Sequence, residues 1–312
     1  MKPSFPPLLW QAVALGMVAG VLARMLLLSS DYRRYPSLPH GYLTHLSLGV
    51  IAAAVGAAAV PAFVRGEWTA VTFLVVVATQ FREIRDMERQ TLRAIDETAL
   101  VPRGPAYIEG IARVFEARSY LTMFVALVTS GSVVLTGSVL AGGLLGGLAL
   151  LQAVKLKTGR TLGEIAAVRE APLRFQGPHL YVEDVYIMNV GLARERDLLR
   201  QHARGFLIEP RDARARDALA EPGQRQAILF ELVNAMGMRK DTSEVVWTPM
   251  LRKNADTGRL ALVAAVIDDD ATAMIHVLER VPVLESARRG VASPAGPERG
   301  AGKDGAGAPW PK

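Results

Sequence analysis

The sequence predicts a polytopic α-helical membrane domain of about five transmembrane helices, followed by a small cytoplasmic α/β domain. Half of the 312 residues are hydrophobic, and the mean hydropathy is +0.22. Long uncharged stretches fill residues 1–154, whereas residues 155–285 alternate strand-like and helix-like patterns. We therefore predict a membrane domain over 1–154, an α/β domain over 155–285 and a disordered tail rich in Gly, Pro and Ala over 286–312.

Composition excludes several classes of protein. The chain has no cysteine, which excludes a disulfide scaffold, thiolate metal sites and thiol catalysis. The net charge is +6, and each half carries three more basic than acidic side chains. So small an excess does not predict nucleic acid as a partner. The hydropathy indicates membrane lipid instead.

Two stretches of the first half are long enough to cross a bilayer. Pro7–Leu28 contains one charge, Arg24, and a hydrocarbon core of ~30 Å needs about 20 helical residues. A signal peptide is the competing interpretation, but the run is long for one and lacks a small-x-small cleavage site. Tyr42–Val64 is the second stretch, and a charged turn follows it.

The remaining spans are less regular. Residues 68–81 can cross only with local thinning of the bilayer or with snorkelling side chains. Residues 119–154 carry no charge and as one helix would measure ~54 Å. We therefore predict two helices there, with a turn near residues 136–138.

Basic residues near the helix ends set the orientation. Seven arginines lie from Arg82 to Arg118, and more basic residues lie in loop 32–41 and just after Val154. We expect a multi-pass protein of the cell membrane, with its N-terminus outside and its α/β domain in the cytoplasm. Arg24 would then snorkel to the inner interface as an anchor, the alternative being a functional intramembrane charge.

Glycines recur four residues apart in the predicted spans. Small residues at this spacing let helix backbones approach closely in lipid, within the chain or between copies. The pattern favours a homo-oligomer. The candidate packing residues are Gly16, Gly20, Gly142, Gly143, Gly146 and Gly147.

The segment 82–118 predicts a cytoplasmic helical loop. Residues 80–99 continue the third span as a helix, residues 101–105 form a rigid turn, and residues 106–118 resume the helix. Gly110 in this helix indicates a close backbone approach or a bend. Two interpretations remain open: a hairpin packed under the bundle, or a docking surface that recruits another protein.

The same loop contains a recognisable motif, because Tyr107, Ile108, Glu109, Gly110, Ile111 and Ala112 spell the signature of the YIEGIA family. Together with flanking motifs at residues 31–41, 69–74, 80–89 and 101–104, it resembles these membrane proteins of endospore-forming bacteria. The resemblance is less distinctive beyond Val154, and we find none after Leu284. With Arg113, the motif is our candidate interaction site.

The resemblance implies an integral membrane protein with a role in sporulation, in the assembly of the spore envelope. It also implies a small companion subunit that caps the protein. It carries over no catalytic residues.

The second half predicts a mixed domain. The expected strands are 180–190, 205–208, 244–250 and 259–267, the expected helices are 192–203, 223–236 and 270–278, and 211–220 is a connector. A hairpin-like turn at 254–258 makes the last two strands antiparallel, which argues against a pure doubly wound sheet.

Few residues of this half indicate chemistry. Asp268, Asp269 and Asp270 suit either a helix N-terminus, the favoured interpretation, or a divalent cation. The histidines lack metal-ligand spacing, Ser243 lacks a G-x-S-x-G context, and there is no Gly-rich nucleotide loop. We predict no enzyme, no cofactor and no metal site.

The function predicted from these features is an oligomeric membrane scaffold for assembly of the spore envelope. The alternative is a channel or transporter component, because the spans contain hydroxyl side chains that suit a polar path. We expect no buried acid or histidine in the spans, and so no proton or ion relay.

Overall fold

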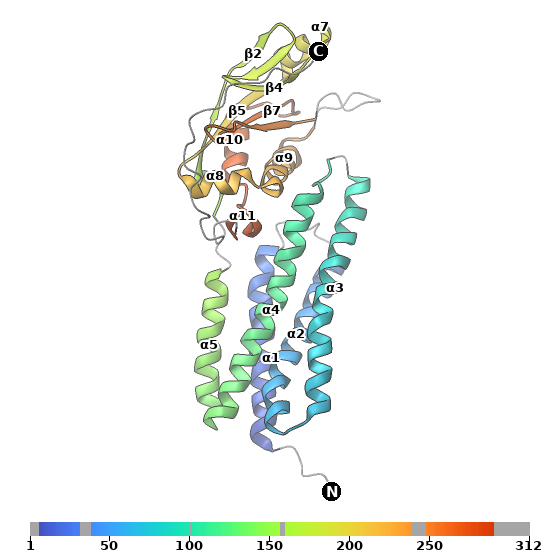
Figure 1. The fold of residues 1–312 in the computed structure, drawn as a ribbon, viewed down its shortest axis with the longest axis vertical. Helices are drawn as coiled ribbons and strands as arrows, with labels where there is room; N and C mark the ends of the chain where they lie inside the picture. Colours follow the sequence, from blue (N-terminus) through green and yellow to red (C-terminus); the bar gives the residue numbers. More distant parts are fainter. Residues whose placement is uncertain (1–5, 32–38, 100, 157–159, 239–247, 290–312) are drawn as a thin grey trace, which may run out of the picture.

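A computed structural model describes residues 6–31, 39–99, 101–156, 160–238 and 248–289. The described chain forms a bundle of long helices and a mixed α/β domain at one end of that bundle (Figure 1). Within the described residues the bundle consists of α1 (Pro7–Asp31), α2 (Pro39–Val64), α3 (Trp68–Thr98), α4 (Pro105–Thr136) and α5 (Val139–Leu156). These helices alternate in direction, so α1 begins at the end of the bundle remote from the domain (Figure 1).

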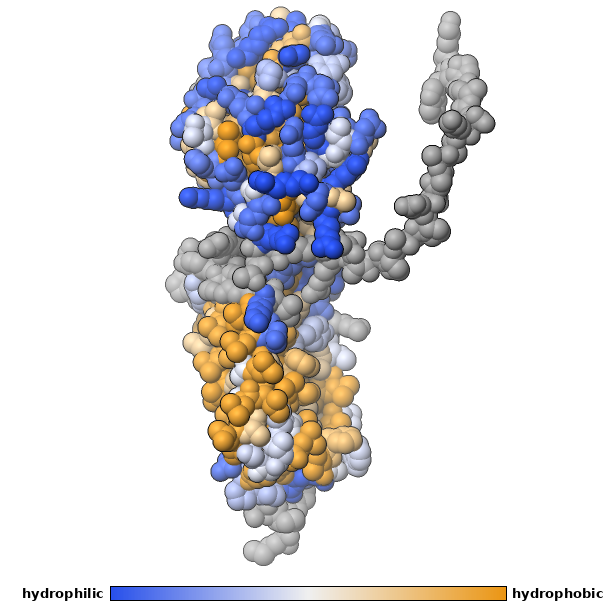
Figure 2. Space-filling view, turned by 90° about the vertical axis from the view of Figure 1, so that its left-hand side faces the viewer, coloured by the Kyte–Doolittle hydropathy of each residue, from blue (hydrophilic) through white to orange (hydrophobic). Residues whose placement is uncertain are grey.

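Three of the described helices are long and apolar enough to cross a membrane. They are α1 within Pro7–Leu28, α2 within Tyr42–Val64, and α4. Val139–Lys155 in α5 is a shorter apolar helix. Figure 2 shows a broad hydrophobic surface over the bundle and a mostly hydrophilic one over the domain. The arrangement is compatible with a membrane protein.

The two longest helices extend beyond the hydrophobic surface toward the domain. α3 continues from its apolar beginning into its charged half without a break, as predicted. α4 runs unbroken for 32 residues, about 48 Å, and so joins the predicted segment 106–118 to the following span. It ends where predicted, at Gly137, whose φ of 68° is left-handed and terminates the helix.

Glycines bring the helices of the bundle together. A Cβ on Gly16 would lie 2.9 Å from the carbonyl oxygen of Ala126, and one on Gly20 would lie 2.7 Å from Cβ of Ala53. On α5, a Cβ on Gly142 or Gly146 would collide with Val133 or Thr129 of α4, whereas nothing lies within 4 Å of one on Gly143 or Gly147. Four of the six glycines therefore make contacts inside the chain, and two face away from it.

The domain is built on an antiparallel sheet with the strand order β1-β5-β7-β6. These strands are β1 (Ala166–Glu170), β5 (Arg204–Pro210), β7 (Leu260–Ala264) and β6 (Met250–Lys253). Every residue of β7 is buried, because the sheet is covered on both faces. Leu260 and Leu262 pack toward the helices, and Ala261 and Val263 toward a second, smaller sheet.

Two different layers cover the central sheet. One contains a three-stranded antiparallel sheet, β2 (Leu173–Gln176), β3 (His179–Val182) and β4 (Val185–Asn189), with α7 (Ala193–His202). The other contains α6 (Leu162–Ile165), α8 (Ala213–Ala220), α9 (Pro222–Met236), α10 (Ala271–Arg280) and α11 (Glu285–Arg289). The second layer faces α4, and it is where the bundle meets the domain (Figure 1).

Several predicted elements of the domain need correction. The single strand 180–190 is the hairpin β3–β4, because the chain turns at Glu183, where φ is 55°. The connector 211–220 contains α8, which Asp212 caps by accepting a hydrogen bond from the Ala215 N–H at 2.7 Å. β1 and β2 were not predicted, since their charged residues obscure the alternation.

The other elements of the domain agree with the prediction. The three predicted helices correspond to α7, α9 and α10, and β6 and β7 are antiparallel. Residues 244–247 of the predicted strand lie outside the described residues. α11 occupies the beginning of the predicted tail, of which residues 290–312 also lie outside the described residues.

Candidate functional site

The motif at residues 107–112 lies in the first turns of α4, where α4 enters the core of the domain. Tyr107 is 0% exposed, and Ile108 and Ile111 are each 2% exposed. They belong to one hydrophobic cluster with Phe206 of β5 and Leu232 of α9. A membrane-length helix therefore has its beginning folded into the domain, and we call this contact region, centred on residues 104–118, the joint.

A glutamine of α9 caps the beginning of α4. Gln226 Oε1 accepts hydrogen bonds from the backbone N–H groups of Ala106, at 3.0 Å, and Tyr107, at 2.9 Å. The first N–H groups of a helix have no partner inside it, and Gly104, the residue before α4, has no side chain to supply one. The Tyr107 hydroxyl donates to Glu231 of α9 at 3.1 Å.

Close backbone approaches complete the joint. A Cβ on Gly110 would lie 3.1 Å from Oγ of Ser286 in α11, and one on Gly223 would lie 2.8 Å from the carbonyl oxygen of Ala106. The glycine in the motif therefore allows a close approach, which is one of the two predicted reasons for it.

Glu109 is the motif residue that connects α4 to α3. Its carboxylate pairs with Arg85, and it lies 3.7 Å from Arg89 and 3.0 Å from Arg113. Arg113 is on the outer surface, with 57% of its side chain exposed. The structure thus buries five of the seven candidate motif residues against the chain itself: Tyr107, Ile108, Gly110, Ile111 and Ala112.

The turn between α3 and α4 is fixed by a nearly buried ion pair. Arg103 Nη1 donates to Asp96 Oδ1 at 3.1 Å, and both side chains are 10% exposed. The other Asp96 oxygen accepts from the Gly104 N–H at 3.1 Å. The Arg103 guanidinium also lies 4.7 Å from the centre of the Phe230 ring, so the turn is attached to α9.

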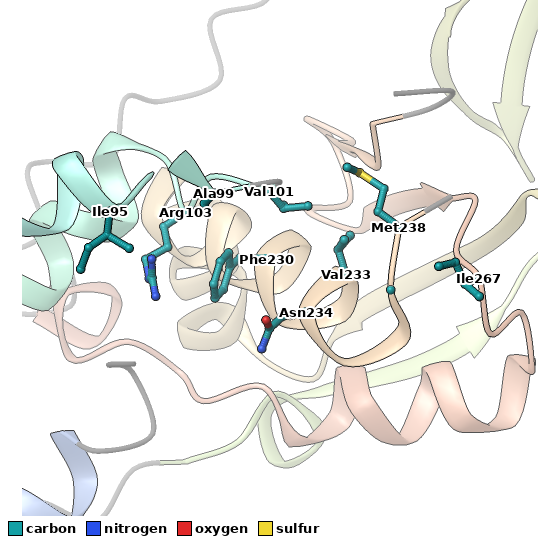
Figure 3. A pocket seen from close by; sticks show the side chains of 10 residues that line it. Ile95, Ala99, Val101, Arg103, Phe230, Val233, Asn234, Met238 and Ile267 are labelled. Atoms are coloured by element: carbon teal, nitrogen blue, oxygen red, sulfur yellow. The ribbon is translucent and has the colours of Figure 1, made fainter. Parts of the chain in front are cut away.

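A groove of about 480 Å³ lies beside this turn. Figure 3 shows its walls, which are mostly apolar and come from the end of α3, the turn and α9. Ile267 at its rim is 65% exposed. The lining residues are Ile95, Ala99, Val101, Arg103, Phe230, Val233, Asn234, Gly237, Met238 and Ile267.

Arg24 lies inside the bundle, which corrects the expectation that it snorkels to the interface. It is 0% exposed. Its Nε donates to the His45 carbonyl oxygen at 3.3 Å, Nη2 lies 3.1 Å from His45 Nδ1, and the guanidinium lies 4.9 Å from the centre of the Phe115 ring. Gly49 makes room for it, because a Cβ there would overlap the Arg24 stem.

His45 corrects a second expectation, that the spans hold no buried histidine. It lies in the apolar stretch of α2 and is 6% exposed. Its ring packs edge to face on Phe115 of α4, with the ring centres 4.6 Å apart. Side chains from three helices, Arg24, His45 and Phe115, therefore meet in the bundle interior near the joint.

Two carboxylates lie near buried arginines of the bundle, Arg118 and Arg24. Arg118 of α4 is 4% exposed and donates to Glu285 of α11 at 3.2 Å, which links bundle and domain directly. Glu88 of α3 lies near Arg24, and burial raises the pKa of its carboxyl to about 7, an effect that the Arg24 charge partly offsets. Glu88 lies beyond the apolar beginning of α3, on the side of the domain.

Sequence reasoning missed the residues of the domain that form the joint. Gln224 is 0% exposed; its Oε1 accepts from the Leu284 N–H at 2.7 Å, and its Nε2 donates to the Pro282 carbonyl at 3.2 Å. The sequence offered one signal for these residues: Gln224 and Gln226 are polar side chains near the start of a helix that begins with Pro-Gly. Their partners lie far away in the sequence and could not be read from it.

The remaining candidates for chemistry lie apart from the joint. Asp270 caps α10 by accepting a hydrogen bond from the Thr272 N–H at 2.9 Å. Across the part of the chain that the structure describes, no three His, Cys, Asp or Glu side chains are grouped so that they could hold a metal ion. The contacts of the joint connect the bundle to the domain through α4.

Comparisons with known proteins cover both parts of the chain. The family model described as YIEGIA protein matches residues 12–293. The chain is 40% identical over 275 residues to the "Uncharacterized protein YphB" of Bacillus subtilis (strain 168), an alignment that covers 88% of this chain and 92% of that protein. No solved structure matches. The family match includes α11, beyond the region where motifs alone indicated it.

Proposed function

The chain belongs to the YIEGIA family, and we propose that it is an integral membrane scaffold that acts in sporulation, in the assembly of the spore envelope. The family resemblance supports the sporulation role. The joint carries the scaffold role, because α4 is both a membrane-length helix and a part of the domain core. A protein bound to the domain would therefore be held in a fixed position relative to the membrane.

We further propose five spans, with the N-terminus outside and the domain in the cytoplasm of the cell membrane. The alternating directions of α1 to α5 support this topology (Figure 1). The apolar beginning of α3 and the whole of α5 are shorter than a hydrocarbon core of ~30 Å. Local thinning of the bilayer around these two helices would accommodate both.

Self-association and a companion subunit belong to the same proposal. Gly143 and Gly147 face away from the bundle, and two such faces suit close helix packing between copies in lipid. The small capping subunit that the family resemblance implies would bind the scaffold outside the membrane. The scaffold itself acts by binding, without a catalytic group, a cofactor or a metal ion, and it does not bind nucleic acid.

Purification of the tagged chain from sporulating cells tests the scaffold. We expect an assembly larger than a monomer in mild detergent, with a small companion or envelope proteins retained. A strain without the gene should form spores with a defective envelope. A monomer without partners, from a strain whose deletion leaves spores intact, would contradict the proposal.

A channel or transporter component remains the second candidate, and the buried polar groups of the bundle favour it. Arg24 and His45 lie in the bundle interior, with Glu88 close to Arg24. Titratable groups inside a bundle are typical of ion and proton pathways. Purified protein in liposomes distinguishes the two: a selective flux that Arg24→Gln or His45→Gln abolishes would favour transport, and no flux would favour the scaffold.

A further inference from the structure

Three exposed arginines surround the point at which the chain enters the domain from α5. Arg160 follows the end of α5, at Leu156, by four residues, so it lies within about 14 Å of that end even if the chain between is fully extended. The α5 end is where the hydrophobic surface of the bundle stops (Figure 2). Arg160 is therefore close to the surface of any bilayer that the bundle crosses.

Arg211 and Arg280 are held beside this entry point. The Arg211 N–H donates to the Ile165 carbonyl at 2.9 Å, and its guanidinium donates to the Gly163 carbonyl at 3.1 Å. The segment after Arg280 pairs with the entry segment, because the Leu162 N–H donates to Val281 at 2.8 Å. The Val283 N–H in turn donates to the Arg160 carbonyl at 2.9 Å.

The charges of these three arginines are not neutralised by the described residues. Within the described ranges, Arg160, Arg211 and Arg280 form no ion pair. Other exposed arginines of the domain do, as Arg169 does with Glu183 at 2.7 Å and Arg204 with Glu170 at 3.3 Å.

The acidic side chains near these arginines in the chain make other contacts. Asp212 caps α8, and Glu209 lies 3.2 Å from Arg169 and 3.6 Å from Arg259. Glu164 lies in hydrogen-bond contact with Thr161, at 3.3 Å, and Glu279 lies 3.7 Å from His276. The entry point thus presents three exposed guanidinium groups that have no carboxylate partner among the described residues, next to the end of the hydrophobic surface of the bundle.

We infer that Arg160, Arg211 and Arg280 form a contact surface for the headgroups of anionic phospholipids in the leaflet next to the domain. Basic side chains near an anionic membrane surface each contribute about fivefold to binding, and the attraction falls off over about a Debye length. The inference rests on the proposed insertion of the bundle into a membrane. With α4 as the rigid connection, this second contact would fix the tilt of the domain over the bilayer.

Fluorescence energy transfer between the domain and labelled lipid headgroups tests this contact. The chain has no cysteine, so the variant Ala213→Cys can be labelled with a single dye. Ala213 is exposed and lies two residues after Arg211. In nanodiscs we expect greater transfer with phosphatidylglycerol than with phosphatidylcholine. At about 1 M salt, where the Debye length is about 3 Å, the difference should vanish.

Two matched triple variants supply the control. Arg160→Gln, Arg211→Gln and Arg280→Gln together should abolish the lipid dependence. Arg169→Gln, Arg200→Gln and Arg204→Gln remove the same charge but affect arginines that already have ion-pair partners, and they should leave it unchanged.

Equal energy transfer with phosphatidylglycerol and phosphatidylcholine would overturn the inference. An equal loss of the lipid dependence in the two triple variants would overturn it as well. The salt dependence of the unmodified chain decides the matter even if the first triple variant fails to fold. A chain that stays in solution without detergent would overturn the proposed function instead, and this contact with it.

Discussion

Gln226 shows how much of the joint depends on single side chains. One oxygen accepts from two backbone N–H groups at the beginning of α4. Replacement by Ala leaves both without this partner, and we expect Gln226→Ala to lower the free energy of unfolding by about 1–3 kcal/mol. Gln226→Glu keeps the acceptor, and a negative charge suits a helix N-terminus, so it should be nearly neutral.

Thermal unfolding in detergent measures the difference between these two variants. Equal destabilisation by Ala and Glu would mean that the carbonyl oxygen of Gln226 is not what holds α4 in place.

Gly110 is the position in the motif where size matters most. A Cβ there would contact Ser286 at 3.1 Å, so Gly110→Leu has no room unless α11 moves. We expect a loss of about 1–3 kcal/mol from overpacking, and weakened assembly. Glu116→Leu, on a side chain that is 18% exposed and pairs with Arg85 at 3.6 Å, is the control and should cost less. Equal tolerance of both substitutions would contradict the close approach.

Glu88 makes the stability of the chain depend on pH near neutrality. Burial raises the pKa of this carboxyl from 4.5 to about 7 in the folded chain. An acid whose pKa is raised on folding favours the folded state fully below its unfolded pKa, and this contribution is lost as the pH rises through the folded value. We therefore expect the unfolding temperature to fall between about pH 5 and pH 8.

Glu88→Gln, which cannot ionise, should flatten this pH dependence. A profile with the same slope in both proteins would assign the pH dependence to other groups.

At the scale of elements, α5 offers two neighbouring glycines with opposite surroundings. A Cβ on Gly146 would collide with Thr129 of α4, whereas one on Gly147 has nothing within 4 Å. Gly146→Leu should therefore destabilise the bundle by several kcal/mol, on the order of the cost of severe overpacking. Gly147→Leu should leave the fold intact and weaken only contacts between copies.

Unfolding in detergent and the mass of the purified assembly distinguish these two effects. A Gly147→Leu protein that keeps its full assembly size would exclude this face as the contact between copies.

The elements that the sequence predicts well are those whose pattern is local. Apolar stretches defined α1 and α2, and Gly137 defined the end of α4. The sequence does not predict that α4 is continuous, because the beginning of the helix is polar on one side. It resembles neither a helix surrounded by lipid nor a helix surrounded by water. β1 was missed for a related reason: Arg169 and Glu170 are exposed at its end, so only its beginning is buried.

The joint lies furthest from what a sequence can show. Tyr107 contacts Glu231 and Gln226, which lie more than a hundred positions away. The signature alone was compatible with a surface for partners, but burial assigns most of it to the chain's own core. Arg24 was misplaced because its apolar neighbours gave no sign of His45 and Phe115 on other helices.

On the scale of the whole molecule, the chain combines a hydrophobic bundle with a hydrophilic domain through one shared helix. Glu109 attaches α4 to α3, Arg118 attaches it to α11, and Tyr107 of the motif attaches it to α9. Movement of the domain relative to the bundle would break these contacts together. The proposed scaffold follows from this rigidity, and it requires that the bundle lies in a membrane with the domain on the inner side.

The accessibility of two single cysteines in intact cells tests that requirement most directly. Glu67→Cys lies in the turn between α2 and α3, at the end of the bundle remote from the domain, and Thr257→Cys lies in the exposed turn between β6 and β7. A membrane-impermeant maleimide should label Glu67→Cys in intact cells, and Thr257→Cys only after the cells are opened. Labelling of Thr257→Cys in intact cells, or of neither site until lysis, would contradict the account.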